Sequence, residues 1–452
     1  MTDMEMALTI ARKVREAGGH SYFVGGYVRD RLMGIENKDI DLEIHGILPE
    51  KLAEILDDLG ERIQIGSSFG VYGLKGYGLD IAMPRKERAT GRGHKDFEVF
   101  VDPFLGTEKA AKRRDFTINA LMMDVLSGDI LDHFSGLSDL EEGLIRHVCD
   151  ETFVEDPLRL FRAAQFAARF RFRIAPETRE LCRQMDVTAL AGERVFEEMK
   201  KALLKAEKPS VFFEEIRRMG QLTVWFPELE QLIGLEQNPR YHQEGDVWTH
   251  TMMVLDEAAR RRSLVRQPLA YMLSALCHDF GKIVATERVD GQLHAFDHEH
   301  KGLPLVRSFL CRLTSERQII EYVMNMVELH MKPHAMFRDN SGIKKSNRMF
   351  DRSAEPFDLV QLAEADIRSS RGVDGPVSEE SFLLERLSVF EEYMSRPYVM
   401  GRDLIEAGLE PDKNFHDLLE YGHKMRLAGV DKESALKQVL AYARSKDRKQ
   451  DE

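Results

Sequence analysis

Cysteine and long apolar runs are both scarce in this sequence of 452 residues. The four cysteines are widely spaced and form no CxxC pair, which argues against a disulfide scaffold and a zinc ribbon and favours a reducing compartment. No stretch approaches the roughly 18 apolar residues that a membrane-spanning helix needs. The first residues, MTDMEM, carry acids where a signal peptide carries basic residues. We therefore expect a cytoplasmic protein.

The charge of the chain is negative overall but uneven along its length. A net charge of -13 excludes a protein that coats nucleic acid nonspecifically. Residues 159–183 nevertheless hold seven basic and two acidic residues, interleaved with phenylalanines, and residues 424–449 hold eight basic and three acidic residues. Such patches attract phosphate-bearing partners. A solvated helix face explains the second run equally well.

The hydrophobic pattern changes about one third of the way along the chain. Short apolar or alternating segments predict strands at residues 21–24, 40–44, 71–74, 79–83 and 118–125, and a polar loop at 85–95. From about residue 153, helical periodicity takes over, as in 157–170, 193–205, 247–261 and 269–280, with an irregular stretch at 333–353. We expect an α+β protein, a mixed α/β head followed by an all-helical remainder.

Three acids alternate with apolar residues along the segment KDIDLEI, residues 38–44. The period-two geometry of a strand places Asp39, Asp41 and Glu43 on one face. Neighbouring carboxylates repel unless a cation lies between them, and hard oxygen ligands select Mg²⁺, which takes the rest of its shell from water and substrate phosphates. Asp80, in a neighbouring predicted strand, is the natural third carboxylate. A solvent-facing acidic strand remains an equal alternative from this segment alone.

A Gly-Gly turn precedes the acidic strand, at residues 25–26. Glycines at such a turn let the backbone approach a phosphate, and the following helix offers unpaired N–H groups. Arg29, in the first turn of that helix, can add charge-assisted hydrogen bonds. The pattern is weak by itself, because a Gly-Gly pair is usually only a turn.

Taken together, GGYVRDRLMG and KDIDLE resemble motif A of the bacterial CCA-adding tRNA nucleotidyltransferases and poly(A) polymerases, a branch of the polymerase β superfamily. Four further segments match motifs of the same family in the same order: RRDFTINAL (113–121), DHFSGLSDLEEGLIR (132–146), EDPLRLFR (155–162) and ERVFEE (193–198). The resemblance implies a polymerase-β-like mixed-sheet head followed by a helical neck.

The resemblance also implies roles for individual residues. Asp39 and Asp41 would hold catalytic Mg²⁺, with Asp80 as a third catalytic carboxylate. Residues of the nucleotide site would be Gly26, Arg29 and Arg114 for the triphosphate, and Asp156, Arg159 and Arg162 for the base and the incoming nucleotide. Asp156 and Arg159 are three residues apart and therefore predicted to share a helix face, where they can read a Watson–Crick edge or form a simple ion pair. Gln165 stands where the family commonly has another arginine.

A histidine–aspartate set marks the helical remainder. His250, the adjacent pair His278 and Asp279, and Asp366 can supply mixed nitrogen and oxygen ligands to a divalent metal. This set resembles the ligands of the HD phosphohydrolase superfamily, which implies phosphatase or 2',3'-cyclic phosphodiesterase activity. Besides Mg²⁺ in the head, Ni²⁺ or Mn²⁺ would then be bound here. Four more histidines lie between these positions, namely His298, His300, His330 and His334.

The leading hypothesis is template-independent addition of CCA to the 3' end of tRNA, using CTP and ATP and releasing pyrophosphate. The predicted domains are the head (1–145), the neck (146–240), an HD domain (241–370) and a helical tail that contacts tRNA (371–452). No membrane partner is expected, and the oligomeric state stays open.

The alternatives are a CC-adding or A-adding enzyme, a poly(A) polymerase, an HD phosphohydrolase with an RNA-binding head, and an RNA-binding protein without chemistry. CC-adding relatives are expected to lack the loop PRKERATGRG, residues 84–93, which is intact here. A poly(A) polymerase is expected to carry a long basic extension, which this sequence does not show after Glu452. The intact Asp39 and Asp41 argue against the third alternative. The fourth leaves both carboxylate sets unexplained.

Overall fold

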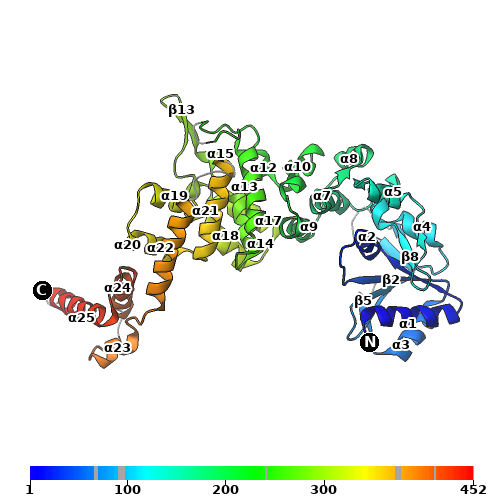
Figure 1. Ribbon diagram of the computed structural model, residues 1–452, viewed down its shortest axis with the longest axis horizontal. Coiled ribbons are helices and arrows are strands. Elements are labelled where there is room, and N and C mark those ends of the chain that lie inside the picture. Colours follow the sequence, from blue (N-terminus) through cyan, green and yellow to red (C-terminus); the bar gives the residue numbers. More distant parts are fainter. Residues whose placement is uncertain (66–69, 90–96, 240–241, 372–377, 412–413, 451–452) are drawn as a thin grey trace. The chain divides into compact units, whose positions relative to one another are not determined.

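The computed structural model describes the chain except for residues 66–69, 90–96, 240–241, 372–377, 412–413 and 451–452 (Figure 1). The described chain forms two compact units. The first comprises Met1–Ala202 with Val211–Val224, and the second Leu203–Ser210 with Trp225–Glu452. No helix in the described part of the chain has both the length and the apolar character that crossing a membrane requires.

The first unit is built around a seven-stranded sheet in the order β3-β4-β5-β2-β1-β8-β9. Strands β2 and β5 run parallel, and the other neighbouring strands run antiparallel. The strands are β1 (His20–Val24), β2 (Ile40–His45), β3 (Arg62–Ile65), β4 (Val71–Leu74), β5 (Leu79–Ala82), β8 (Met122–Asp124) and β9 (Ile130–Leu131). The mixed sheet and the helical remainder confirm the predicted fold class.

Helices α1 (Asp3–Glu16) and α3 (Pro49–Leu59) pack against the apolar side of this sheet. The alternation of β2 explains the arrangement, because Ile40, Leu42 and Ile44 enter the core shared with both helices. Their neighbours Asp41 and Glu43 are only partly buried on the opposite face, as predicted. The remaining short elements are α2 (Gly26–Leu32), α4 (Thr107–Lys112), a 3-10 turn (Thr117–Asn119) and α5 (Gly136–Glu141).

A set of helices follows the sheet in the sequence. Strands β10 (Leu144–Ile145) and β11 (Arg173–Ile174) form a short parallel pair beside α7. The helices are α6 (Asp150–Phe153), α7 (Leu158–Phe170), α8 (Pro176–Arg183), α9 (Gly192–Lys205) and α10 (Ser210–Arg218). Apolar residues recur at helical spacing on α7, so that Leu160, Phe161 and Ala164 are buried while Arg159 and Arg162 remain partly exposed.

The second unit is helical, and α13 (Val247–Arg261), α14 (Pro268–Cys277), α18 (Arg317–Leu329) and α21 (Pro356–Arg371) pack together at its centre. The other helices are α11 (Leu222–Trp225), which starts in the first unit, α12 (Pro227–Glu230), α15 (Lys282–Ala285), α16 (His298–Lys301), α17 (Leu303–Leu313), α19 (Met331–Arg338), α20 (Ile343–Arg352), α22 (Ser378–Ser395), α23 (Gly401–Glu406), α24 (Phe415–Leu427) and α25 (Lys432–Gln450). A hairpin of β12 (Thr286–Val289) and β13 (Gln292–Ala295) separates α15 from α16.

The structure corrects several predicted elements. The predicted loop begins as strand β6 (Arg85–Ala89), which pairs with β7 (Phe97–Val101), whereas residues 90–95 lie outside the described part. The predicted strand at 118–125 is the 3-10 turn followed by the shorter β8, and the irregular stretch at 333–353 is mostly α19 and α20. The hairpin β12–β13 interrupts a region predicted as helical. Strand pairing depends on partners that local propensity does not reveal.

Candidate functional site

The turn between β1 and α2 lies close to Arg114 and to the carboxylate of Asp41. Gly25 has a φ of +66°, which favours glycine. A Cβ atom there would lie 3.0 Å from Arg114 Nη1 and 3.5 Å from Asp41 Oδ2. Gly26 was the residue predicted from the sequence, but Gly25 is the residue whose missing side chain leaves room for both groups. The second glycine begins the helix.

Three carboxylates gather where β2 meets β5. Asp41 and Asp80 are direct neighbours in the parallel pairing, and Asp39 lies just before β2. Asp80 and Asp39 are exposed, and Asp41 is partly buried. Burial and the negative charges of Asp80 and Asp39 raise the pKa of Asp41 to about 6, against the opposing effect of Arg114. The three carboxylates repel one another, and a hard cation bound between them relieves this repulsion. The donor set therefore fits Mg²⁺.

A pocket of about 390 Å³ opens beside these carboxylates. Arg114 lines it and is held by Glu43 Oε2 at 3.2 Å, while Glu43 Oε1 lies 2.8 Å from Nε2 of His45. The sequence predicted that Glu43 lies on the acidic face of β2, but it did not indicate Glu43 as a site residue. The lining includes Asp41, Glu43, Asp80, Arg85, Arg113, Arg114 and Arg159. Acids and arginines therefore face one space large enough for a nucleotide's phosphates.

Two of the predicted nucleotide ligands are instead engaged with carboxylates of the protein. Arg29 is 3% exposed, donates to Asp30 and Asn119, and lies over the rings of Phe166 and Phe170. Burial lowers its pKa despite the charge of Asp30. This guanidinium ties α2 to the neck helix α7.

Arg162 is the second of these arginines. It donates through Nε to Asp115 Oδ2 at 2.7 Å, and its Nη2 lies 2.6 Å from the same oxygen. Asp115 is buried, yet the charge of Arg162 and a hydrogen bond from Asn119 outweigh burial and lower its pKa. A further neighbour of Arg162 is Glu198, at 3.9 Å.

Asp156 and Arg159 do not share a helix face, which corrects the prediction. Helix α7 begins at Leu158 because Pro157 lacks an N–H and favours a helix start, so Asp156 precedes the helix and accepts from the backbone N–H of Leu158. The same carboxylate pairs with Arg194 at 3.1 Å. Arg159 donates to the carbonyl oxygens of Thr152 and Arg113.

Gln165 occupies the position where the family commonly has an arginine. It is buried within α7, with 1% of its surface exposed. The side chain at this position therefore faces the interior of the first unit and does not line the pocket beside the carboxylates.

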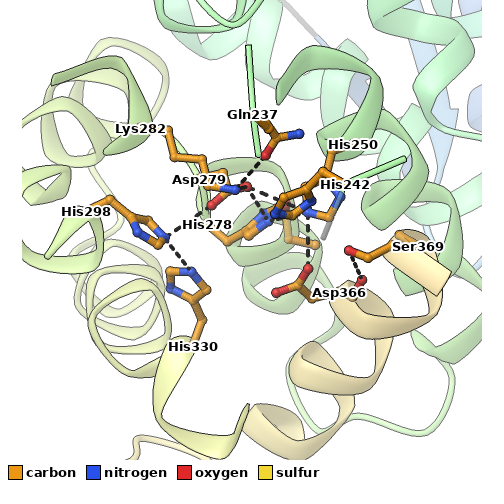
Figure 2. Close-up of polar contacts among 12 residues, drawn as sticks. Gln237, His242, His250, His278, Asp279, Lys282, His298, His330, Asp366 and Ser369 are labelled. Carbon is orange, nitrogen blue, oxygen red and sulfur yellow. Dashed lines mark hydrogen bonds and ion pairs between the residues drawn. The ribbon is translucent and has the colours of Figure 1, made fainter. Parts of the chain in front are cut away.

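The four predicted metal ligands of the helical unit meet at one buried place (Figure 2). His250 comes from α13, His278 and Asp279 follow α14, and Asp366 comes from α21. His250 Nε2 lies 3.1 Å from Asp366 Oδ1 and 3.6 Å from Asp279 Oδ2, and His278 Nε2 lies 3.3 Å from Asp279 Oδ2. Imidazole nitrogens and carboxylate oxygens converging in this way form a donor set that fits a transition-metal ion.

Outer carboxylates orient this cluster. Glu244 Oε1 lies 2.8 Å from Nδ1 of His250, and burial of His250 is outweighed by Asp366 and Glu244, which raise its pKa to about 9. His334 lies between Glu379, at 2.7 Å, and Asp366, at 3.2 Å. Carboxylates of this kind fix the orientation and the tautomer of a histidine ring that binds a metal. Glu244 and Glu379 were missed because an isolated glutamate carries no spacing signal.

Family models match two parts of the chain, and solved structures resemble its fold over most of its length. Residues 21–146 match the poly A polymerase head domain, and residues 171–233 match a domain described as the probable RNA and SrmB-binding site of polymerase A. The Thermotoga maritima CCA-adding enzyme complexed with tRNA has a TM-score of 0.64 at 22% identity, with 97% of this chain and 95% of that chain covered. The Bacillus stearothermophilus CCA-adding enzyme in complex with CTP has a TM-score of 0.65 at 20% identity, with 99% and 100% covered.

Two curated relatives are more similar in sequence. The multifunctional CCA protein of Actinobacillus pleuropneumoniae is 36% identical over 365 residues, which are 78% of this chain and 86% of the relative. That of Alkalilimnicola ehrlichii is 37% identical over 404 residues, which are 85% of this chain and 94% of the relative. The chain belongs to the family of the multifunctional CCA proteins, within the bacterial CCA-adding and poly(A) polymerase group.

Proposed function

We propose that this protein adds CCA to the 3' end of tRNA from CTP and ATP and releases pyrophosphate. One observation carries the proposal: Asp41 and Asp80 stand side by side on β2 and β5, facing an arginine-lined pocket. The relatives named for CCA support it, as do similar structures that contain tRNA or CTP. Because tRNA matures and works in the cytoplasm, we expect the protein there.

In this proposal Asp39, Asp41 and Asp80 hold the divalent cation. When bound, Mg²⁺ neutralises charge on the oxygens that attack and leave. Arg114, which Glu43 holds beside Gly25, faces the triphosphate. The protein lowers the barrier by holding the tRNA hydroxyl and the α-phosphorus in line and by offsetting charge.

The resemblance gives Gly26 and Arg29 a place at the triphosphate. Because the guanidinium of Arg29 is buried against Asp30 and Asn119, we assign it the task of holding the turn at Gly25 in shape. Gly26, the first residue of α2, keeps the backbone of that turn open to a phosphate. Arg29 is thus a positioning residue in this proposal.

Base selection is assigned to Asp156 and Arg159, with Arg162 supporting them from Asp115. A carboxylate accepts from an exocyclic amino group, and a guanidinium donates to a ring nitrogen or carbonyl. Asp156 is paired with Arg194, and Arg159 with two backbone carbonyls, in the nucleotide-free arrangement. A bound base therefore has to replace these contacts, which favours bases that offer the same donors and acceptors.

The test uses tRNA transcripts that lack one, two or three terminal nucleotides, incubated with CTP and ATP. The proposal expects all three to be completed to CCA and no further. A product that stops at CC, a requirement for pre-existing CC, or a long A tail would instead identify the CC-adding, A-adding or poly(A) alternative. Asp41→Asn, which removes one proposed metal ligand, serves as the inactive control.

A second activity is favoured by the buried cluster of His250, His278, Asp279 and Asp366. We propose that it hydrolyses phosphate esters, including terminal 2',3'-cyclic phosphates, with Ni²⁺ or Mn²⁺ bound. Such an ion polarises the phosphoryl group and activates water. Hydrolysis of p-nitrophenyl phosphate and of a 2',3'-cyclic nucleotide, measured with each metal, tests it. Absence of hydrolysis with every metal would reduce the cluster to a structural centre.

The proposed domain limits follow from these two sites. Residues 1–145 carry nucleotide addition, 146–240 form the neck, 241–370 carry the second centre, and 371–452 contact tRNA. The basic run at 424–449 lies on α24 and α25 and supports the last assignment. Neutral substitutions of Lys424 and Lys437 should weaken tRNA binding and reduce its dependence on salt.

A further inference from the structure

Asp39 lies just outside the sheet, unlike the two carboxylates beside it. Strand β2 begins at Ile40, one residue after Asp39. The pairing of β2 with β5 therefore holds Asp41 and Asp80 but stops short of Asp39. Residues 35–39 have no regular secondary structure. The place of this carboxylate must therefore be determined by contacts other than strand pairing.

Asn37 supplies such contacts through both ends of its amide group. Its Oδ1 accepts from the backbone N–H of Asp39 at 3.0 Å, and its Nδ2 donates to Oδ2 of Asp30 at 2.9 Å. The chemistry determines which end is which, because an N–H only donates and an ionised carboxylate only accepts. An asparagine side chain that bonds the backbone two residues on forms a compact turn. Here the same side chain also ties that turn to Asp30.

Asp30 is a firm anchor because it is buried and paired. Its exposed fraction is 2%, and Nε of Arg29 donates to its Oδ1 at 2.8 Å, while its Oδ2 accepts from Asn37. Arg169 of α7 lies 3.8 Å from the same Oδ2. Moving a buried carboxylate with several donors is costly, since each broken bond leaves an unpaired polar group in the interior.

The anchor continues into the helix that carries residues of the nucleotide site. Arg29 donates through Nη1 to Asn119 at 2.6 Å, and Asn119 donates to Asp115 Oδ1 at 3.0 Å. The other oxygen of Asp115 accepts from Arg162 on α7. Arg29 and Arg162 also both lie over the ring of Phe166, on the same helix. An unbroken run of hydrogen bonds therefore joins α7 to the turn before β2.

We propose that Asn37 is a positioning residue for nucleotide addition, which holds Asp39 at a fixed place relative to α7 and Arg162. The inference rests on the proposed function, in which Asp39 is a ligand of the cation. Asn37 acts through Asp39 and needs no contact with the substrate. Because the two bonds of its amide have different partners, they can be removed one at a time.

Hydrogen exchange without metal or nucleotide tests the position of Asp39 directly. Asn37→Ala removes both bonds of the amide, so in EDTA the backbone N–H of Asp39 should exchange about fivefold faster. Overlapping peptides that cover residues 36–44 measure it. Peptides from β1 and β5 should exchange as in the parent protein, which checks that the head is folded. Unchanged exchange at Asp39 would overturn the inference.

Single-turnover addition of one CMP to a shortened tRNA measures the consequence for the site. In Asn37→Ala, the Mg²⁺ concentration that gives half the maximal rate should rise about tenfold, because a displaced Asp39 binds the ion less well. With saturating Mg²⁺, the KM for CTP should stay within a factor of two, since Arg114 and Asp41 are untouched. A lower maximal rate with an unchanged Mg²⁺ requirement would indicate general damage to the head and contradict the inference.

Asn37→Ser separates the two bonds. A serine hydroxyl can accept from the N–H of Asp39 but is too short to reach Asp30. We expect slower exchange at Asp39 than in Asn37→Ala, together with a Mg²⁺ requirement that is still raised. A requirement equal to that of the parent protein would show that the contact with Asp30 contributes nothing, and the proposed link to α7 would fail.

Glu36→Gln is the matched control, since Glu36 is the exposed neighbour of Asn37 in the same segment. It should equal the parent protein in both measurements. An effect as large as that of Asn37→Ala would assign the support to the segment as a whole and overturn the inference. If the parent protein adds no nucleotide, the proposed function fails, while the exchange measurement still decides whether Asn37 holds Asp39.

Discussion

Both candidate centres contain aspartates, but the aspartates of the head are mostly exposed and the central aspartate of the helical unit is buried. In the head, Asp39 and Asp80 are exposed and one arginine stands close to Asp41, beside an open pocket. In the helical unit, Asp279 is 2% exposed and lies among histidines and a lysine. The difference shows which centre depends on its substrate for charge balance. In the head, the negative charge of the carboxylates is left for a nucleotide and its cation to balance. In the helical unit, the metal-binding groups are enclosed by the protein.

The acidities express this difference. Burial acts to raise the pKa of both Asp41 and Asp279. In the head, Asp80 and Asp39 add to that effect and the pKa of Asp41 reaches about 6. In the helical unit, electrostatic attraction to His278 and Lys282 outweighs burial and holds the pKa of Asp279 well below its ordinary value. Neighbours of like charge thus raise the pKa of an aspartate, and neighbours of opposite charge lower it.

The largest expected effect comes from removing a head carboxylate. Asp41→Ala should lower nucleotide addition about 1000-fold, equivalent to roughly 4 kcal/mol of barrier, because the cation loses a ligand beside the α-phosphorus. Single-turnover addition of one CMP to a shortened tRNA measures it. Hydrolysis of p-nitrophenyl phosphate should stay unchanged. Asp58→Asn, an exposed acid on α3, is the control and should add CMP normally. Retention of a tenth of the activity in Asp41→Ala would contradict the assignment.

The converse substitution comes next in size. His278→Ala should reduce phosphate-ester hydrolysis about 100-fold, roughly 2.7 kcal/mol, while CCA addition stays within a factor of two. The reason is that each proposed catalytic ligand of nucleotide addition lies in the first unit and His278 in the second. Both activities are measured on one preparation whose helical content is checked by circular dichroism. A parallel loss of both activities with the fold intact would end the two-centre hypothesis.

Much of the head could be predicted because its signals are local. The alternation of Ile40, Asp41 and Leu42 determines which face of β2 enters the core, and the structure confirms it. The neighbouring position of Asp80 was predicted from one acid between apolar residues, and strand pairing bears it out. The helix was predicted from residue 157 and begins at Leu158, but Asp156 was wrongly placed on its face, because Asp156 precedes the helix and its side chain accepts from the backbone N–H of Leu158.

The helical centre shows what sequence spacing leaves out. His250, His278, Asp279 and Asp366 were selected as a set, and the fold brings them together. His298 and His330 were noticed without a role, because nothing local indicates that a hairpin and a Gly281–Gly302 contact return the chain to Asp279. Glu244 and Glu379 contact the rings of His250 and His334, and because an isolated glutamate carries no spacing signal, only the structure reveals these contacts.

A smaller effect is expected on base choice. Asp156→Ala should reduce discrimination against UTP and GTP about tenfold, near 1.4 kcal/mol, and slow correct addition less, because the phosphates and carboxylate ligands are untouched. Incorporation of each of the four nucleoside triphosphates into a shortened tRNA measures it. Arg194→Ala removes the partner of Asp156 without removing the acceptor and should keep the discrimination. Unchanged selectivity in Asp156→Ala would show that other residues read the base.

The smallest effect concerns stability, and it sharpens the contrast between the two aspartates. The folded-state pKa of Asp41, about 6, exceeds its ordinary value of 3.8, so the folded protein bears a cost for the charged form. Above pH 6 the group is ionised in both folded and unfolded states and the full cost applies. Below about 3.8 it is protonated in both and the cost disappears. With EDTA present, Asp41→Asn should therefore stabilise the head at pH 7.5 by about 1 kcal/mol after allowance for solvent screening, and the gain should vanish as the pH falls towards 4.

Both tryptophans, Trp225 and Trp248, lie in the second unit, so hydrogen exchange of peptides from β1 and β2 is the suitable probe. The exposed Asp58→Asn should show no such gain at pH 7.5. A destabilisation at pH 7.5 that shrank towards low pH would reverse the sign and show that Arg114, rather than the neighbouring acids, dominates the charge around Asp41.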